Sequence, residues 1–297
     1  MQLTYADELQ WTPLTAIREG AKEMKELLIG TEGAPDNYRL VMIREAGAAA
    51  TTPRHKHNFD QVRIVLNGRA NYGPKRWIEP GELAYFPEGT PYGPEVSDGN
   101  RLGLTLQCGG ASGAGYVSNR QVKSATATLK ERGEFRGGVY YPSDFEAPGH
   151  PSGDSAKRKA QDAFEACWEL VTGRRISYPK PRYDEPIKMT PANFTWEEQP
   201  GQPGVRAKLL GSFTERRHEL ALMQVEPNRV ALLGPRAGIQ LVFVVRGSGT
   251  VDGRALRPHA AFEIAAGSAA QVTAADELEL IVIGLPIFVA AKQPSTV

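Results

Sequence analysis

The sequence predicts a mainly β protein, built from two similar barrel or sandwich units with a helical segment between them. Glycine (31) and proline (22) divide the 297-residue chain into short apolar runs of strand length. One run recurs, because QVRIVLNG at 61–68 is matched by QLVFVVRG at 240–247. Between these two copies lies one stretch with apolar residues at helical spacing. Short strands, a repeat and one helix together favour a duplicated all-β fold.

Eight runs of aliphatic and β-branched residues are predicted to be strands. Four lie in the first part of the chain, at 38–44, 61–66, 83–86 and 102–107. Four lie in the last part, at 220–225, 240–245, 261–264 and 278–283. Residues 21–29 fit either one face of a helix or a strand that pairs through the turn after it. Strands this short, separated by turn residues, are typical of sandwiches and barrels.

A helix is predicted over 155–173, where Phe164, Cys167, Trp168 and Val171 share one face and Gly173 provides a stop. We expect its aromatic residues to hold the two β units together. The helix divides the chain into an N-terminal unit (1–120), a connecting segment (121–204) and a C-terminal unit (205–297).

Composition excludes several classes of protein. With 35 basic and 34 acidic residues the net charge is +1, which gives no reason to expect a nucleic-acid partner. Cys108 and Cys167 form no Cys-x-x-Cys motif, so a reducing cytoplasm is expected. The N-terminus lacks the pattern of a signal peptide, and no apolar run reaches the roughly 20 residues of a membrane span. A cytoplasmic protein without a membrane partner is therefore predicted.

Two groups of residues carry a specific spacing. His55 and His57 are separated by one residue. Three residues then separate His57 from Gln61, and six separate Gln61 from Gly68. Downstream, five residues separate Gly81 from Pro87-x-Gly89, and Tyr92 follows after two more. This resembles the two signature motifs of the cupin superfamily, His-x-His-x3–4-Glu-x6-Gly and Gly-x5-Pro-x-Gly-x2-His. The resemblance implies a jelly-roll (double-stranded β-helix) barrel over 40–107, with a degenerate copy over 205–285, so that the whole chain looks like a bicupin.

The sequence departs from those motifs at the positions that bind metal in the family. Gln61 stands where the first motif has an acid, and Tyr92 stands where the second has a histidine. In the second copy Gly234 and Arg236 replace the two histidines. Any metal or ligand is therefore predicted to bind in the N-terminal unit alone.

Alternate residues of a strand share a face, so Gln61 and Arg63 are expected to point inward with the histidines. The opposite face carries Val62, Ile64 and Leu66, and must pack on a second layer or on the other unit. A guanidinium inside a barrel needs a partner, which could be Glu82, Glu95 or an anionic ligand. Tyr72 and Tyr85 are aromatic pocket walls on one interpretation and plain core on the other.

Two functions remain open. The first is a metal-dependent cupin enzyme of the oxygenase or isomerase type, acting on a small anionic or carboxylate-bearing molecule. A divalent metal (Fe, Mn, Ni or Zn) would bind His55, His57 and Gln61, while Arg63 would anchor the substrate and Tyr92 would transfer a proton. The second is a non-catalytic protein that binds a small molecule without metal. A homodimer is expected in either case.

Overall fold

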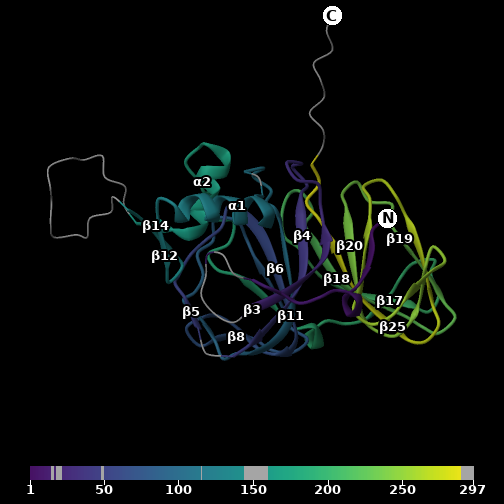
Figure 1. The fold of residues 1–297 in the computed structure, drawn as a ribbon. Helices are drawn as coiled ribbons and strands as arrows, with labels where there is room; N and C mark the ends of the chain where they lie inside the picture. The colour runs from purple at the N-terminus through teal and green to yellow at the C-terminus, as the bar shows by residue number, and fades with distance from the viewer. Residues whose placement is uncertain (15–16, 18–21, 48–49, 115, 144–159, 289–297) are drawn as a thin grey trace, which may run out of the picture.

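The computed structural model describes residues 1–14, 17, 22–47, 50–114, 116–143 and 160–288. Its framework is two antiparallel seven-stranded sheets lying side by side (Figure 1). The first sheet has the order β15 (Ile187–Met189), β9 (Leu83–Phe86), β6 (Phe59–Gly68), β11 (Asn100–Gly109), β4 (Tyr38–Ala46), β3 (Lys22–Ile29) and β2 (Thr12–Pro13). The second has the order β1 (Leu3–Tyr5), β23 (Ala260–Ile264), β20 (Gln240–Arg246), β25 (Leu278–Gly284), β18 (Glu219–Val225), β17 (Val205–Ser212) and β16 (Glu197–Glu198).

Smaller sheets complete each half. The N-terminal unit adds β5 (Ala50–Thr52) with β10 (Glu95–Ser97), and β7 (Ala70–Gly73) with β8 (Arg76–Ile78). The C-terminal unit adds β19 (Val230–Leu233), β24 (Ala270–Ala274), β21 (Gly249–Val251) and β22 (Arg254–Leu256). All eight predicted strands are confirmed, and residues 22–29 form a strand, which resolves the ambiguous stretch. The paired strands form open sheets, so the arrangement as two barrels stays a prediction.

The internal repeat is visible in the strand order. In the first large sheet, β6 carries the Gln-to-Gly run and lies between β9 and β11. In the second, β20 carries the corresponding run and lies between β23 and β25, the equivalents of β9 and β11. The edge strands are exchanged. β1, at the start of the chain, pairs with β23, whereas β15, which precedes the second copy, pairs with β9. The division of the chain at 120 and 204 remains a prediction. Both boundaries are crossed by strand pairing, that of β1 with β23 and that of β15 with β9.

The two large sheets share one core. Val62 and Ile64 of β6, which are fully or almost fully buried, belong to the same apolar cluster as Leu241 and Phe243 of β20. This confirms that the outward face of β6 packs on the other half. The interior of the C-terminal unit is a second apolar cluster, in which Val242, Val244 and other aliphatic side chains are buried.

The connecting segment differs from the prediction. Two helices are present, α1 (Asn119–Lys130) and α2 (Ala163–Thr172), together with a small sheet of β12 (Gly133–Arg136), β13 (Val139–Pro142) and β14 (Gln161–Asp162). The predicted helix over 155–173 thus begins at Ala163, because Asp162 caps it by accepting from the backbone nitrogen atoms of Phe164 and Glu165. Residues 155–159 of that prediction lie outside the described residues. Short 3-10 turns occur at Ala6–Glu8 and Pro191–Asn193.

The expected role of the helix is wrong. Phe164 and Trp168 pack with Val122 and Leu129 of α1 and with Phe59 of β6, so both helices cover one end of the N-terminal unit instead of joining the two halves (Figure 1). Cys108 and Cys167 are free and buried. Within the described part of the chain, no helix is long and apolar enough to cross a membrane.

Candidate ligand site in the N-terminal unit

The N-terminal unit contains a cavity of about 200 Å³. Its walls come from alternate residues of the three central strands, as the pleat of a sheet requires. These inward residues are Arg39, Ile43 and Glu45 of β4, Phe59, Gln61 and Arg63 of β6, and Arg101, Thr105 and Gln107 of β11. The inward direction predicted for Gln61 and Arg63 therefore agrees with the structure.

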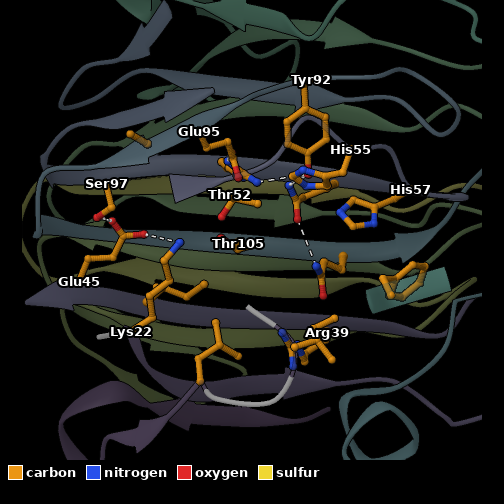
Figure 2. A pocket seen from close by; sticks show the side chains of 18 of the residues that line it. Lys22, Arg39, Glu45, Thr52, His55, His57, Tyr92, Glu95, Ser97 and Thr105 are labelled. Atoms are coloured by element: carbon orange, nitrogen blue, oxygen red, sulfur yellow. Dashed lines mark hydrogen bonds and ion pairs between the residues drawn. The ribbon is translucent and has the colours of Figure 1, made fainter. Parts of the chain in front are cut away.

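His55 and His57 lie together at one end of this cavity (Figure 2). Their ring centroids are 5.0 Å apart. The two predicted motifs meet here, because His55 and Tyr92 form an isolated antiparallel bridge and their ring centroids are 4.4 Å apart. The Nδ1 atom of His55 lies 2.8 Å from the carbonyl oxygen of Pro53. A carbonyl only accepts, so Nδ1 carries a hydrogen and donates it to Pro53.

Arg63 connects the predicted polar residues. Its guanidinium is paired with Glu95 of β10, and its Nη2 donates to the Tyr92 hydroxyl at 3.3 Å. The amide of Gln61 lies between Arg63 and Gln107. The amide orientation that gives Arg63 an acceptor places the Gln61 oxygen 2.8 Å from Arg63 Nε and 3.0 Å from Nη2. The guanidinium of Arg63 therefore has three acceptors, the Glu95 carboxylate, the Tyr92 hydroxyl and the Gln61 amide oxygen.

Glu95 is the internal acid that Arg63 requires, while Glu82, the other acid considered, pairs with Lys188. Burial alone would raise the pKa of Glu95, but the positive charge of Arg63 outweighs it and lowers the pKa to about 2. Glu95 is therefore ionised at neutral pH, and the pair is electrically neutral.

A second ion cluster lies along the same cavity. Glu45 accepts from Lys22 at 3.1 Å and from Arg101 at 2.8 Å, and Ser97 donates to it at 2.5 Å (Figure 2). Burial acts to raise the pKa of Glu45, but Arg101 and Lys22 hold it below its usual value. One carboxylate here faces two cations, so the cluster as a whole remains positive.

Arg39 differs from the other cations of the cavity. It is 7% exposed and lines the cavity, yet among the described residues its guanidinium donates no hydrogen bond, and its Nε atom is buried without a partner. Its ion pair is a loose one, with Nη1 3.9 Å from a Glu26 oxygen. Among the described residues that line the cavity, five side chains are cationic and two are carboxylates, so the lining carries a net positive charge.

The wall under the helices is apolar. Phe164, in the first turn of α2, lies against His57 with ring centroids 5.2 Å apart and against Phe59 at 5.4 Å. Phe59 stacks on His57 at 4.4 Å and meets Tyr116 edge-on at 5.4 Å. We call these four side chains the ring row. It runs from Tyr116, whose hydroxyl donates to Gln107 opposite Arg39, to the histidine pair.

Two predicted wall residues are placed elsewhere. Tyr85 lies opposite Val62 in the pairing of β6 with β9, and so faces the core between the two halves, where it stacks on Phe213 at 4.5 Å. Tyr72 packs on Phe86 in a separate apolar cluster beside the cavity. Neither belongs to the cavity lining. The pairing of Tyr85 with Val62, which faces away from the cavity, is what excludes Tyr85 from the cavity wall.

Sequence reasoning missed three contributors, Arg39, Tyr116 and the helix α1. The helix had a readable signal. Ser118 and Gln121 form a capping box, and Val122, Ala125, Thr126 and Leu129 recur at helical spacing after it. Arg39 stands in an apolar strand sequence, and only the register of β4 with β11 and β3 reveals that it faces inward.

The residues present do not assemble a usual metal centre. Within the described ranges, no group of three or more His, Cys, Asp or Glu side chains could hold a metal ion. His55 and His57 supply two nitrogen donors, but the Gln61 oxygen faces Arg63, and the cavity is positive. Divalent cations usually take three or four protein donors, with carboxylate among the common ones.

The sequence matches no family model and no curated protein. Solved structures do match over nearly the whole chain. A proposed dioxygenase from Nostoc punctiforme is 10% identical, with a TM-score of 0.61 over 98% of this chain and 87% of that one. A proposed glyoxylate-induced protein from Pseudomonas aeruginosa is 9% identical, with a TM-score of 0.60 over 98% and 90%. An oxalate decarboxylase from Lactobacillus farciminis, in a formate complex, is 12% identical, with a TM-score of 0.56 over 97% and 87%.

These similarities, at such low identity, define the fold. The class is a mainly β protein with two related halves. The particular fold is the cupin fold, which confirms the resemblance drawn from the His55–Tyr92 motifs.

Proposed function

We propose that the cavity of the N-terminal unit binds a small organic carboxylate, and that Arg39 holds its carboxylate group. The observation that carries this proposal is a buried guanidinium, without a hydrogen bond among the described residues, on the wall of a positive cavity. Burying such a charge costs several kcal/mol unless an anion compensates it, and the Glu26 carboxylate, 3.9 Å away, accepts no hydrogen bond from Arg39. A guanidinium grips a carboxylate through two parallel hydrogen bonds, so a carboxylate is the compensating group that suits it.

The other cations are poorer anchors because they already have partners. Arg63 is paired with Glu95, and Arg101 and Lys22 share Glu45. Arg69, the remaining cation of the lining, is paired with Asp98. Arg63, which was expected to anchor the substrate, is instead suited to positioning Tyr92. Because Arg63 donates to the phenol oxygen, it holds the Tyr92 hydroxyl in place beside His55.

Two further observations support the N-terminal unit as the ligand unit. The interior of the C-terminal unit is filled by aliphatic side chains, and Arg236 there donates to the carbonyl oxygen of Leu285 at 2.7 Å. Oxalate, glyoxylate and formate, which appear in the descriptions of proteins with a similar fold, are small carboxylates. A cavity of about 200 Å³ also suits a ligand smaller than those of drug-sized pockets, which are roughly 300–1,000 Å³.

Calorimetric titration of oxalate, malonate and benzoate into wild type and Arg39→Met tests this proposal. We expect at least one carboxylate to bind, with affinity reduced about tenfold or more in the variant, because charge-assisted hydrogen bonds are lost. The matched control is Arg44→Met, on the same strand, whose side chain is half-exposed and paired with Glu23. Equal loss in both variants, or no binding by wild type, would contradict the proposal.

Thermal unfolding of the same variants adds an independent readout. A residue kept for stability destabilises the protein when it is removed. Arg39 has no hydrogen bond to lose among the described residues, so Arg39→Met is expected to keep or raise the melting temperature while it weakens carboxylate binding. A fall of more than about 5 °C, or roughly 2 kcal/mol at this size, would make Arg39 a structural residue.

One observation favours a second candidate, the metal-dependent enzyme. Histidines that bind metal through one nitrogen usually donate the other N–H to a carbonyl or carboxylate, as His55 does to Pro53. A divalent metal would bind His55 and His57 and would polarise an anionic substrate there. Metal analysis of protein purified without chelator, compared with His55→Ala/His57→Ala, tests this candidate. A metal content that is unchanged in the double variant would exclude the histidine pair.

Gln61 separates the two candidates further. In Gln61→Glu a carboxylate replaces the amide, and a carboxylate is the stronger ligand for a dication. If the metal binds here, its affinity should rise in the variant while the affinity for carboxylates falls. Equal metal affinities would place Gln61 outside the coordination sphere.

A further inference from the structure

We infer that the carboxylate ligand of this site is aromatic, with a flat ring lying along the ring row and its carboxylate on Arg39. The inference rests on the proposed function and names the ligand class of the same site. It comes from an asymmetry of the cavity. Apart from Ile43 and Phe59, the inward residues of the three central strands are charged or polar, while the wall under the helices is built of rings.

The ring row connects the two polar ends of the cavity. Tyr116 lies at the Arg39 end, because its hydroxyl donates to Gln107, the residue opposite Arg39 in the strand pairing. Phe59 lies in the middle, and His57 and Phe164 lie at the other end. Successive ring centroids are 4.4–5.4 Å apart, which is the spacing of packed aromatic pairs. A ligand held by Arg39 that extends toward the histidines must therefore run along this row.

Aliphatic side chains continue the same surface. Val117 and Val122 line the cavity beside Tyr116, and both are at least nine-tenths buried. A compact dicarboxylate would be too short to cover this apolar wall. Its second carboxylate would also lie against apolar side chains that offer it no hydrogen bond. A benzoate-like anion carries one charge for Arg39 and an apolar face for the wall, so that it satisfies both sides of the cavity.

The placement of Phe164 supports a role toward a ligand. Its helix begins one residue earlier, and the Asp162 carboxylate accepts from the backbone nitrogen of Phe164 at 2.8 Å. The cap fixes the first turn of α2, and the first turn carries the ring that closes the cavity over His57. The position of this ring is thus set by local chain geometry and not by packing alone.

Titrations of benzoate, cyclohexanecarboxylate and malonate into wild type, Phe164→Leu and Phe135→Leu test the inference. Leucine keeps most of the apolar volume, so folding is retained while the ring is lost. Phe135 packs on the same apolar cluster but does not line the cavity, which makes its variant the matched control. We expect wild type to bind benzoate about tenfold more tightly than malonate. We also expect Phe164→Leu to weaken benzoate about two- to tenfold, malonate not at all, and Phe135→Leu to change neither.

The possible failures are distinguishable. If malonate binds as tightly as benzoate, or if Phe164→Leu weakens both equally, the aromatic class is overturned while an Arg39-dependent carboxylate site stands. If cyclohexanecarboxylate matches benzoate, the body of the ligand is apolar but not aromatic, and the inference fails in that form. If no carboxylate binds wild type, the proposed function fails together with the inference.

Discussion

The pair of Arg63 and Glu95 allows a quantitative test of the cavity electrostatics. Glu95→Gln keeps the shape of the side chain and removes its charge, which leaves a buried guanidinium without its counter-ion. The pKa of Glu95 is lowered from 4.5 to about 2 by Arg63. A lowering of this size corresponds to about 3 kcal/mol of folding free energy at neutral pH. Both side chains are only 12% exposed, so solvent screening reduces this value little.

The sign of the pH dependence follows from the lowered pKa. The stabilisation is complete above the unfolded-state pKa of 4.5 and is lost as the pH falls through the folded-state pKa of about 2. The difference in unfolding free energy between wild type and Glu95→Gln should therefore be about 3 kcal/mol at pH 7 and about 1.5 kcal/mol at pH 3.

Urea denaturation at both pH values measures this difference. Glu277→Gln is the control, because its pair with Arg246 is about half-exposed and its loss should cost at most about 1 kcal/mol. A difference for Glu95→Gln that is below 1 kcal/mol at pH 7, or that does not change with pH, would refute the argument.

Three further predictions concern the framework. Deleting residues 1–5 removes the edge strand of the second sheet, so hydrogen exchange should accelerate in β23, about 250 residues away, and not in β9. Asp60→Ala leaves the fully buried ring of His218 without its hydrogen-bond partner, and unfolding in urea should show a loss of about 1–3 kcal/mol. Asp162→Ala removes the cap of α2, which should cost about 1 kcal/mol in thermal unfolding and weaken benzoate while malonate is unaffected.

Strand parity accounts for most of what could be predicted of the site. Because alternate residues face opposite sides, the apolar run around Val62 was sufficient to place Gln61 and Arg63 inside and the aliphatic face against the other half. The requirement that a buried guanidinium be paired led to Glu95 as one of two candidate acids. The parity signal is complete within a few residues of sequence, whereas Glu95 is 32 residues from Arg63 and follows from the need for a counter-ion.

The rest depended on contacts between distant segments. Arg39 faces the cavity because β4 pairs with β11 in one particular register, and no residue near it in sequence indicates this. The exchange of β1 and β15 is equally invisible locally, because each strand is three residues long and pairs with the other half. Phe164 was assigned to packing between the units, whereas the position of α1 places it over the cavity.

The central claim is that a carboxylate binds Arg39 inside the N-terminal unit. A crystal structure with 4-bromobenzoate tests it most directly, because the anomalous signal of bromine fixes the position and direction of the ligand. We predict carboxylate oxygens about 3 Å from the Arg39 guanidinium and the bromine beside His57 and Phe164. A ligand whose carboxylate lies on another cation, or a bromine signal found only outside this cavity, would contradict the account.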